Sequence, residues 1–317
     1  MNDKPSSPTV GRNLAVSMRP ATFNEYLGNE RIVTDIRSRL DSHRIPTAFL
    51  FSGPKGSGKT TLARCISNHL EGEYSERNAA DETGVDAARE LGEQAQHRPL
   101  LGDYKIIVLD EGHQLTKQAQ NALLKHVEDA PPSTIWIFCT TEPTKLIPTL
   151  RDRCVSYALQ GLKADQVALL VYRGLQFLGK KGGSEPKIEE LIKVLVQENI
   201  IYPRAILNAV DCFYGGMDPL AAAFGSQDAP QAFEIARAVW KRDWPSVQRL
   251  FAQATADEAM AIRAVTANYF KSILLKDDNS EFCAAAIRKL TENVPFDGPL
   301  GFSHLVATLY SICKGIK

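Results

Sequence analysis

The stretch Gly53-Pro54-Lys55-Gly56-Ser57-Gly58-Lys59-Thr60 fits the pattern G-x-x-x-x-G-K-[ST], in which a glycine-rich loop cradles phosphate groups. The apolar run AFLFS precedes it and the helix-like run TTLARCISNHL follows it, as the pattern requires. Successive backbone N–H groups and a helix N-terminus together make a site for a polyphosphate. We therefore expect Lys59 to reach the β- and γ-phosphates of a nucleotide and Thr60 to hold Mg²⁺. A chance glycine-rich turn is the alternative.

Apolar runs and helical spacing alternate along residues 30–139. Near-continuous apolar runs, typical of buried parallel strands, cover Ala48–Ser52, Tyr104–Asp110 and Thr134–Cys139. Helical spacing covers residues 30–40, 60–70, 86–96 and 115–127. This alternation predicts an α/β fold, with a parallel sheet covered by helices on both faces.

Composition excludes several classes of protein. The 317 residues suggest two or three domains, and Lys+Arg and Asp+Glu are both 37, so any contact with nucleic acid must be a local patch. The six cysteines form no CxxC pair, which indicates reduced thiols and argues against a zinc module. No apolar run approaches the roughly 20 residues of a membrane span, and the N-terminus lacks a signal-peptide core, so we expect a cytoplasmic protein without a membrane partner.

Residues beyond about Gly161 show only helical periodicity, over 163–214 and again over 230–317. Between them, Gly215–Ala229 is rich in Gly, Ala, Asp and Pro and is interpreted as a linker. The apolar stripes of these helices, which include Phe270, Tyr310 and Cys313, predict bundle cores rather than a cofactor site. The predicted domains are a tail over 1–17, a P-loop domain over 18–160, and helical domains over 161–216 and 217–317.

Two acids follow the strand YKIIVLD. Asp110 ends it, 50 residues beyond Thr60, and Glu111 comes next. In a P-loop ATPase, one acid at this strand tip can orient Mg²⁺, and a second can polarise the attacking water and accept its proton. An ordinary solvated acidic turn is the alternative. His113 follows closely, and we interpret it as structural, because histidine often serves only as a hydrogen-bonding group.

Further polar residues lie where they could reach a phosphate. The strand TIWIFC ends in Thr140-Thr141, where a hydroxyl can bond a γ-phosphate or merely cap the strand. Arg153 follows the helix-like segment TKLIPTLRD, and arginine stabilises charge on a transferring phosphoryl group, on its own nucleotide or a neighbour's. Arg204 begins a helix and could fold over the nucleotide. A surface salt bridge is the alternative for either arginine.

Several segments in order resemble the AAA+ clamp-loader ATPase subunits: GPKGSGKTT, TGVDAARELGEQAQ, YKIIVLDEGHQLTKQAQNALLKHVEDAPP, FCTTEPTKLIPTLRDRC and PRAILNAVD. The opening RPATFNEYLGNE also resembles the family's RPxxFxExxGxE box. The likeness spans Met18 to Tyr214. It implies a P-loop AAA+ parallel-sheet domain over 18–160, a helical lid over 161–216 and an all-α collar used for oligomerisation over 217–317.

The resemblance also implies a role for each matched residue. Lys59 and Thr60 would belong to Walker A, and Asp110 and Glu111 would form the Walker B pair. Thr141 would be sensor 1, Arg204 sensor 2, and Arg153 an arginine finger that acts catalytically, with Glu111 and Lys59, on ATP in the adjacent subunit. The implied Mg²⁺ ligands are Thr60 and Asp110. The implied nucleotide-binding set is Gly53, Pro54, Lys55, Gly56, Ser57, Gly58, Lys59, Thr60, Thr61, Asp110, Thr141 and Arg204.

The chain departs from the family pattern at three positions. Asp152 replaces the usual serine before Arg153, and it could hold the arginine away from ATP until assembly closes, or be neutral. Met18 stands where the family commonly has tyrosine, and Pro203 is unusual before sensor 2. No zinc insertion separates the P-loop from YKIIVLDEG, and the chain ends soon after the expected collar. Both features favour a phage T4-type large subunit over a bacterial gamma/tau subunit, with replication factor C small subunits also similar.

DNA in this family lies inside a spiral of subunits and is held by helix N-termini and basic side chains. Arg89, in TGVDAARELG, matches the family's phosphate-contacting arginine, and Lys117 is a weaker candidate. Phosphate contacts position a duplex without reading its sequence, which suits a protein that accepts any primer–template junction. A solvated surface charge is the alternative for both residues.

The resemblance implies an ATPase motor subunit that uses ATP and Mg²⁺ to open a sliding clamp and load it on primer–template DNA during replication. Its partners would be the clamp, DNA, other copies of the chain and a different clamp-loader subunit, in a hetero-pentamer. Two alternatives are a binding-only subunit with an inactive P-loop, and another AAA+ DNA motor such as a branch-migration helicase. The presence of Lys59, Thr60, Asp110, Glu111 and Arg153 argues against the inactive form.

Overall fold

The computed structural model describes residues 13–81, 84–179, 185–214, 219, 222–223, 230–252, 254, 259–274, 280–291 and 298–315. They fall into two compact units: residues up to Arg173 with Asn199–Arg204, and Gly174–Glu198 with residues from Ala205 onward. Residues 1–12 of the expected tail and most of the expected linker 215–229 lie outside the described residues. None of the helices in the described ranges is long and apolar enough to cross a membrane.

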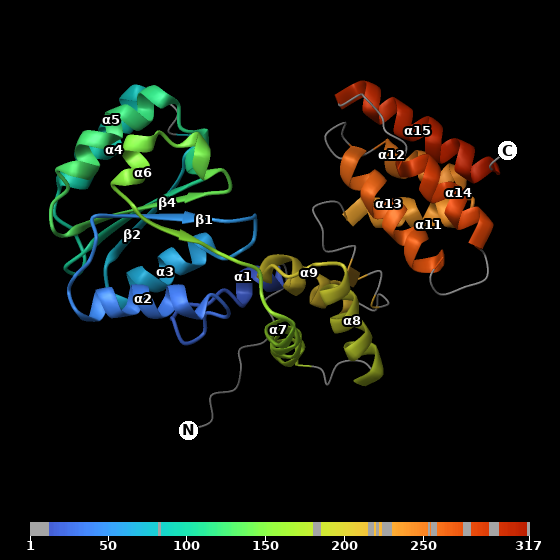
Figure 1. Cartoon of the computed structure of the whole chain (residues 1–317), viewed down its shortest axis with the longest axis horizontal. Coiled ribbons are helices and arrows are strands. Elements are labelled where there is room, and N and C mark those ends of the chain that lie inside the picture. Colours follow the sequence, from blue (N-terminus) through green and yellow to red (C-terminus); the bar gives the residue numbers. More distant parts are fainter. Residues whose placement is uncertain are drawn as a thin grey trace. The chain divides into compact units, whose positions relative to one another are not determined.

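The first unit is built on a five-stranded parallel sheet with the order β2-β3-β4-β1-β5 (Figure 1). Its central strands are β1 (Ala48–Ser52), β3 (Lys105–Asp110) and β4 (Thr134–Thr140), each within one residue of its predicted bounds. The two edge strands, β2 (Glu73–Asn78) and β5 (Val155–Ala158), were not predicted. The strand β4 lies between the strand that enters the P-loop and the strand that ends in Asp110.

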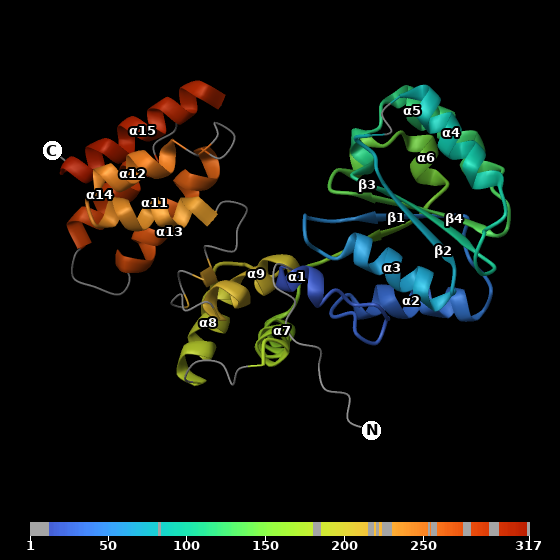
Figure 2. The same ribbon diagram turned by 180° about the vertical axis from the view of Figure 1, so that it is seen from behind.

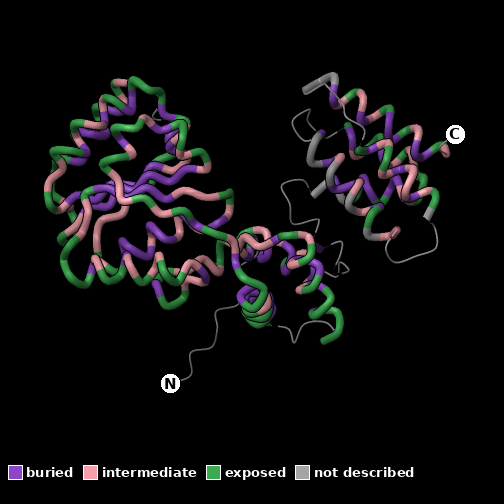
Figure 3. The backbone as a smooth tube through the Cα atoms, viewed as in Figure 1, coloured by how far each residue is buried: buried purple, intermediate pink, exposed green. Residues whose placement is uncertain are grey.

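Helices cover both faces of this sheet, as predicted (Figure 2). The helices α2 (Glu30–Asp41) and α3 (Lys59–His69) cover one face, where they pack on Phe49 and Phe51 of β1. The helices α4 (Val85–Gln96), α5 (Lys117–Glu128) and α6 (Pro148–Asp152) cover the other face. There they pack on Ala48 and Leu50, the alternate residues of β1. The central strands β1, β3 and β4 are largely buried, whereas the outer helix faces are exposed (Figure 3).

Short helices and the start of the helical region complete the first unit. The short elements are α1 (Leu14–Ser17), η1 (Gly112–Gln114) and η2 (Pro143–Lys145). The helices α7 (Ala164–Phe177), α8 (Glu185–Gln197) and α9 (Pro203–Tyr214) follow. The helix α8 belongs to the second unit, and the residues of α7 and of α9 are divided between the two units. Proline at the first position of α9 fits a helix start, because its missing N–H needs no partner there.

The second unit contains a helical bundle with its own apolar core. Its helices are α11 (Pro230–Trp240), α12 (Trp244–Phe251), α13 (Ala259–Leu274), α14 (Ser280–Thr291) and α15 (Gly298–Lys314). Phe270 and Cys313 are buried in this core, as predicted. Tyr310 is 46% exposed, so its assignment to the core is wrong, and its ring instead packs edge-on against Trp244 with centroids 4.9 Å apart.

Candidate nucleotide-binding site

The predicted site residues follow neighbouring strands at their carboxyl ends. Ser52 of β1 is in register with Thr140 of β4, and Leu109 of β3 with Phe138 of β4. The P-loop leaves β1 directly after Ser52, and Asp110 ends β3. The parallel sheet therefore delivers the P-loop, the acidic pair and the Thr140-Thr141 turn to one edge, which is where open α/β sheets bind ligands.

The glycines of the P-loop are required by its backbone. Gly53, Gly56 and Gly58 have φ angles of 146°, 77° and 100°, values that residues with a Cβ atom rarely adopt. A Cβ atom on Gly58 would lie 2.7 Å from the hydroxyl of Tyr26, and one on Gly53 would lie 2.8 Å from the carbonyl oxygen of Leu159. The loop is thus closely approached by Tyr26 and by Leu159.

Lys59 begins α3 and its side chain folds back over this loop. Its Nζ donates hydrogen bonds to the carbonyl oxygens of Gly53, at 2.8 Å, and Pro54, at 3.1 Å. The residue is only 7% exposed, and burial lowers the pKa of the ammonium, while the nearby Glu111 and Asp110 oppose that shift. The ammonium therefore lies at the centre of the loop, within reach of groups bound there.

The loop fits a polyphosphate by an observation independent of the motif. Ser57 is 2% exposed and its hydroxyl has no hydrogen-bond partner among the described residues, which is costly for a buried polar group. The N-terminus of α3 begins at Lys59 and adds unpaired backbone N–H groups to the same place. A phosphate oxygen would satisfy both, so Gly53–Thr61 can hold the phosphates of a nucleotide.

The acidic pair is shaped by the turn that follows β3. Glu111 has φ 52° and ψ 41°, and its backbone N–H donates to Asp110 Oδ1 at 3.0 Å. Burial raises the pKa of Asp110, opposed by that hydrogen bond and by the charge of Lys59. The carboxylate of Asp110 is thus fixed by the turn and interacts electrostatically with the P-loop lysine.

Magnesium fits this site only if a bound nucleotide and water supply part of its coordination. The hydroxyl of Thr60, in the first turn of α3, and the carboxylate of Asp110 are the hard oxygen donors that Mg²⁺ prefers. No cluster of three or more His, Cys, Asp or Glu side chains that could hold a metal occurs in the part of the chain that is described. The ion would therefore need oxygens from phosphate and water, as is usual for Mg²⁺ with nucleotides.

Arg204 joins the site and Thr141 lies at its edge. A Cβ atom on Gly56 would lie 3.0 Å from the Cβ atom of Arg204, and the charge of Arg204 helps to lower the pKa of Lys59. Thr141 follows the end of β4 and is half-buried. The hydroxyl of Thr140 already contacts His113 and accepts from Glu142 N, so Thr141 is the better candidate of the two to contact a phosphate.

Arg153 is not among the residues that act on Lys59. It caps α6, and its Nη2 and Nε lie 2.8 Å and 3.0 Å from Glu128 Oε1, at the end of α5. The carboxylate that contacts the arginine here is Glu128, and the role of Asp152 beside it stays a prediction. The prediction that Arg153 acts on a nucleotide stays a prediction.

The two candidate DNA-binding residues lie on the helix pair α4 and α5. Arg89, in the middle of α4, has a 64% exposed side chain and contacts Asp86 at 3.4 Å. Lys117 is the first residue of α5 and is exposed. Both side chains are exposed, on helices that cover the same face of the sheet, and their contact with DNA stays a prediction.

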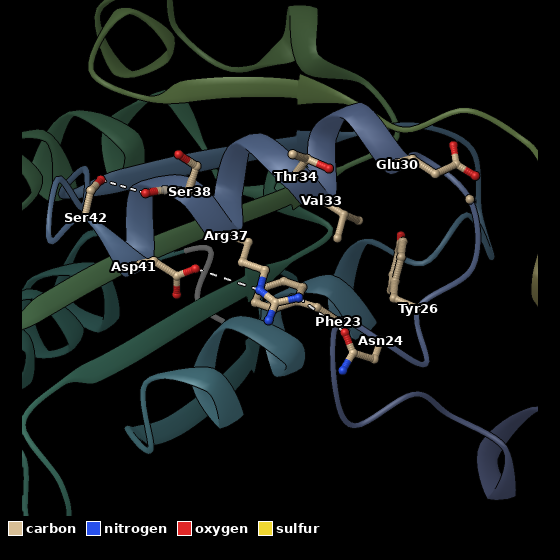
Figure 4. Close-up of a pocket in the computed structure, with 11 residues that line it drawn as sticks. Phe23, Asn24, Tyr26, Glu30, Val33, Thr34, Arg37, Ser38, Asp41 and Ser42 are labelled. Carbon is tan, nitrogen blue, oxygen red and sulfur yellow. Dashed lines mark hydrogen bonds and ion pairs between the residues drawn. The ribbon is translucent and has the colours of Figure 1, made fainter.

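An open depression of about 700 Å³ runs along α2 and contains none of the P-loop residues (Figure 4). Its lining includes Phe23, Tyr26 and Arg37, and Figure 4 shows Arg37 between Asn24 and Asp41. Tyr26 connects it to the P-loop, since its hydroxyl lies 3.5 Å from the carbonyl oxygen of Gly58. Burial raises the pKa of Tyr26, so this hydroxyl stays protonated and able to donate.

Three residues make contacts at the site that the sequence did not predict. Tyr26 contacts Gly58, Glu128 contacts Arg153, and His113 contacts Glu111. No local spacing connects Tyr26 or Glu128 to the residue it contacts. His113 was noticed for its place after Glu111, and its interpretation as a hydrogen-bonding residue agrees with its 3.1 Å contact with Thr140 Oγ1.

The chain is similar to replication proteins over much of its length. Residues 74–163 match a family model described as DNA polymerase III, delta subunit. The DNA polymerase III subunit gamma/tau of Mycobacterium bovis is 32% identical over 231 residues, covering 59% of this chain and 40% of that protein. The subunit tau of Escherichia coli is 28% identical over 273 residues, covering 77% and 42%. The chain thus spans less than half the length of these curated relatives.

A solved structure supports the fold. RuvB of Thermotoga maritima superposes with a TM-score of 0.55 at 18% identity, over 70% of this chain and 79% of that chain. An identity this low bears on the fold alone. With the five-stranded parallel sheet and the following helices, it confirms the predicted fold class, a parallel α/β sheet domain followed by helical regions.

Proposed function

We propose that the chain is an ATP-hydrolysing motor subunit of a clamp loader, which opens a sliding clamp and places it on primer–template DNA. The observation that carries the proposal is the convergence of the P-loop, Lys59 and the Asp110-Glu111 pair at one sheet edge. The similarity to gamma/tau subunits of DNA polymerase III supplies the replication context.

In this proposal each group at the site has one task. The backbone of Gly53–Thr61 and the ammonium of Lys59 bind the phosphates, and Thr141 and Arg204 contact the γ-phosphate. Glu111 accepts a proton from the attacking water. Mg²⁺, held by Thr60 and Asp110 with the phosphates, would neutralise charge on the phosphate oxygens.

Arg153 would complete the site of a neighbouring copy. Arginine donors are worth most where phosphoryl charge develops, and Arg153 is exposed at the end of α6. Nucleotide would then favour a closed assembly, because the closed form alone contains this contact. We propose residues 161–216 as a lid and 217–317 as a collar that joins the copies to one another and to a different subunit, in a hetero-pentamer in the cytoplasm.

The finer type of loader is a separate question. The missing zinc insertion favours a phage T4-type large subunit, and this preference stays a prediction, whereas the curated relatives reported above are bacterial gamma/tau subunits. Stimulation by a bacterial clamp and its delta-type subunits, with none by phage clamp proteins, would decide for the bacterial type.

Steady-state ATP hydrolysis with clamp and primed DNA tests the proposal. We expect turnover that both stimulate, and none above background for Lys59→Ala. Equal rates for the two proteins would indicate the binding-only alternative. A strand-displacement assay addresses the remaining alternative, because a branch-migration motor separates strands and a clamp loader leaves them paired.

A further inference from the structure

His113 lies at the centre of a group of polar side chains beside the candidate catalytic acid. It sits in η1, directly after the Asp110-Glu111 turn, with a side chain that is 14% exposed. Its Nδ1 atom lies 3.5 Å from Glu111 Oε2 and 3.1 Å from Thr140 Oγ1. Its Nε2 atom lies 3.7 Å from Glu142 Oε1. The ring thus connects the residue after β3 to the residues at the end of β4.

The carboxylate of Glu111 lies beside this ring. Its Oε2 atom is buried and has no hydrogen bond within the described residues, and His113 Nδ1 lies 3.5 Å from it. A carboxylate can only accept, so Nδ1 must carry a proton to serve it. The turn at Glu111, with φ 52°, fixes the backbone but leaves the side-chain torsions free, and a proton on the adjacent Nδ1 would restrict them.

The other side of the ring is anchored to the turn after β4. The hydroxyl of Thr140 is buried and accepts from Glu142 N at 3.0 Å, which fixes its position. Lys145 Nζ lies 2.9 Å from Glu142 Oε1, and this contact lowers the pKa of Glu142. Glu142 therefore stays ionised beside Nε2. A shift of this turn, which contains Thr141, would move the ring.

We propose that His113 is a positioning residue that holds the carboxylate of Glu111 in its working orientation and links that orientation to the turn containing Thr141. This inference rests on the proposed function, in which Glu111 activates the attacking water. A contact of Thr141 with the γ-phosphate would then reach Glu111 through Thr140 and the imidazole. His113 itself touches no substrate.

Two near-isosteric variants separate the roles of the two ring nitrogens. The amide nitrogen of asparagine can replace Nδ1, and that of glutamine can replace Nε2. In the full chain assembled with clamp and primed DNA, we expect His113→Leu and His113→Gln to lower kcat roughly 10- to 100-fold, the range typical for loss of a residue that orients a working side chain. We expect His113→Asn to retain most of kcat, and KM for ATP to stay within about twofold throughout. Equal losses for Asn and Leu, or a change confined to KM, would overturn the proposal.

A background without the carboxylate tests the pairing directly. In Glu111→Gln, adding His113→Leu should lower the residual kcat by less than about twofold, because residues that act as a unit are non-additive. A purely structural histidine would cause the same loss in both backgrounds. Melting temperatures of all variants show whether any loss reflects unfolding.

An NMR measurement keeps the inference independent of turnover. With ¹⁵N-labelled histidine in the full chain, the His113 ring signals are assigned by their absence in His113→Asn. We expect a protonated Nδ1 whose signal moves in Glu111→Gln, and an unmoved signal would overturn the proposal. Absence of turnover in the unaltered protein would instead count against the proposed function, so the two failures are distinguishable.

Discussion

Arg153 is held by Glu128, a residue 25 positions earlier in the chain, through its Nη2 atom at 2.8 Å and its Nε atom at 3.0 Å. The contact joins the end of α6 to the end of α5, and both side chains are well exposed, at 53% and 36%. An exposed ion pair is weak, so a stronger acceptor such as a phosphate can displace Glu128. Arg153 can therefore exchange Glu128 for such an acceptor at little cost in free energy.

Glu128→Gln should favour release of Arg153. An exposed ion pair contributes about 0.2–1 kcal/mol, so removing the Arg153–Glu128 pair should favour binding of Arg153 to a neighbour's phosphate by roughly 1.5- to 5-fold. We expect the subunit concentration for half-maximal ATPase activity to fall by that factor, measured with clamp and primed DNA in excess. Asp152→Asn is the control and should change nothing. A rise in the required concentration would mean that Glu128 supports the interface.

Arg153→Ala should abolish stimulated hydrolysis. The loss of an arginine that meets a neighbour's phosphoryl group is typically about 10³-fold or more in kcat. Binding of a fluorescent ATP analogue to the isolated chain should stay unchanged, since no neighbour is present there. Arg153→Lys should not restore activity, because an ammonium lacks the guanidinium fork. Weakened binding in the isolated chain would place Arg153 on its own nucleotide.

Gly58→Ala should destabilise the protein. The residue has φ 100°, and an added Cβ would lie 2.7 Å from the Tyr26 hydroxyl. We expect the free energy of unfolding to fall by about 1–3 kcal/mol in urea titrations, the usual cost of such backbone strain. Tyr26→Ala removes the steric contact but leaves the backbone strain at position 58. We therefore expect Gly58→Ala to cost less free energy of unfolding in a Tyr26→Ala background than in the unaltered protein, but still to be destabilising there.

The matched control for this substitution is Gly84→Ala. Gly84 has φ −76° and no atom within 4 Å of an added Cβ. The free energy of unfolding should therefore change by no more than about 0.5 kcal/mol in this variant. If the two variants were equally stable, the tight approach of Tyr26 to the loop would have no energetic consequence.

Arg89→Ala should weaken stimulation by DNA. Each phosphate contact contributes about 0.9 to the slope of log affinity against log salt, so we expect the slope to decrease in magnitude by roughly one. Arg37→Ala is a matched control, since this exposed arginine lies on α2, on the opposite face of the sheet. Equal slopes for Arg89→Ala and the unaltered protein would exclude Arg89 from the DNA contact.

The central strands were predictable from the sequence because they are buried on both faces. All residues of β4 are buried, and its apolar run is visible in the sequence. The edge strand β2 has the sequence EYSERN and no buried residue, so it has the polar composition of a loop. Its pairing with β3 is made by backbone hydrogen bonds, which leave no trace in side-chain periodicity.

The same distinction applies to the site. Lys59, Asp110 and Glu111 were predicted because a local motif or a strand end specifies each of them. The contacts of Arg153 with Glu128 and of His113 with Thr140 join residues 25 and 27 positions apart. Such contacts depend on how α6 meets α5 and how β3 and β4 end together, which a single sequence does not encode in any spacing.

The acceptors that hold Lys59 are the main-chain carbonyl oxygens of Gly53 and Pro54. A point substitution alters a side chain and leaves both oxygens in place, so mutation in the loop does not delete them. Reshaping the loop is also restricted, because a Cβ on Gly53 would lie 2.8 Å from Leu159 O. Over evolutionary time, the strength with which this lysine is held would therefore change mainly through residues outside the loop, such as those that set the charge and burial around its ammonium.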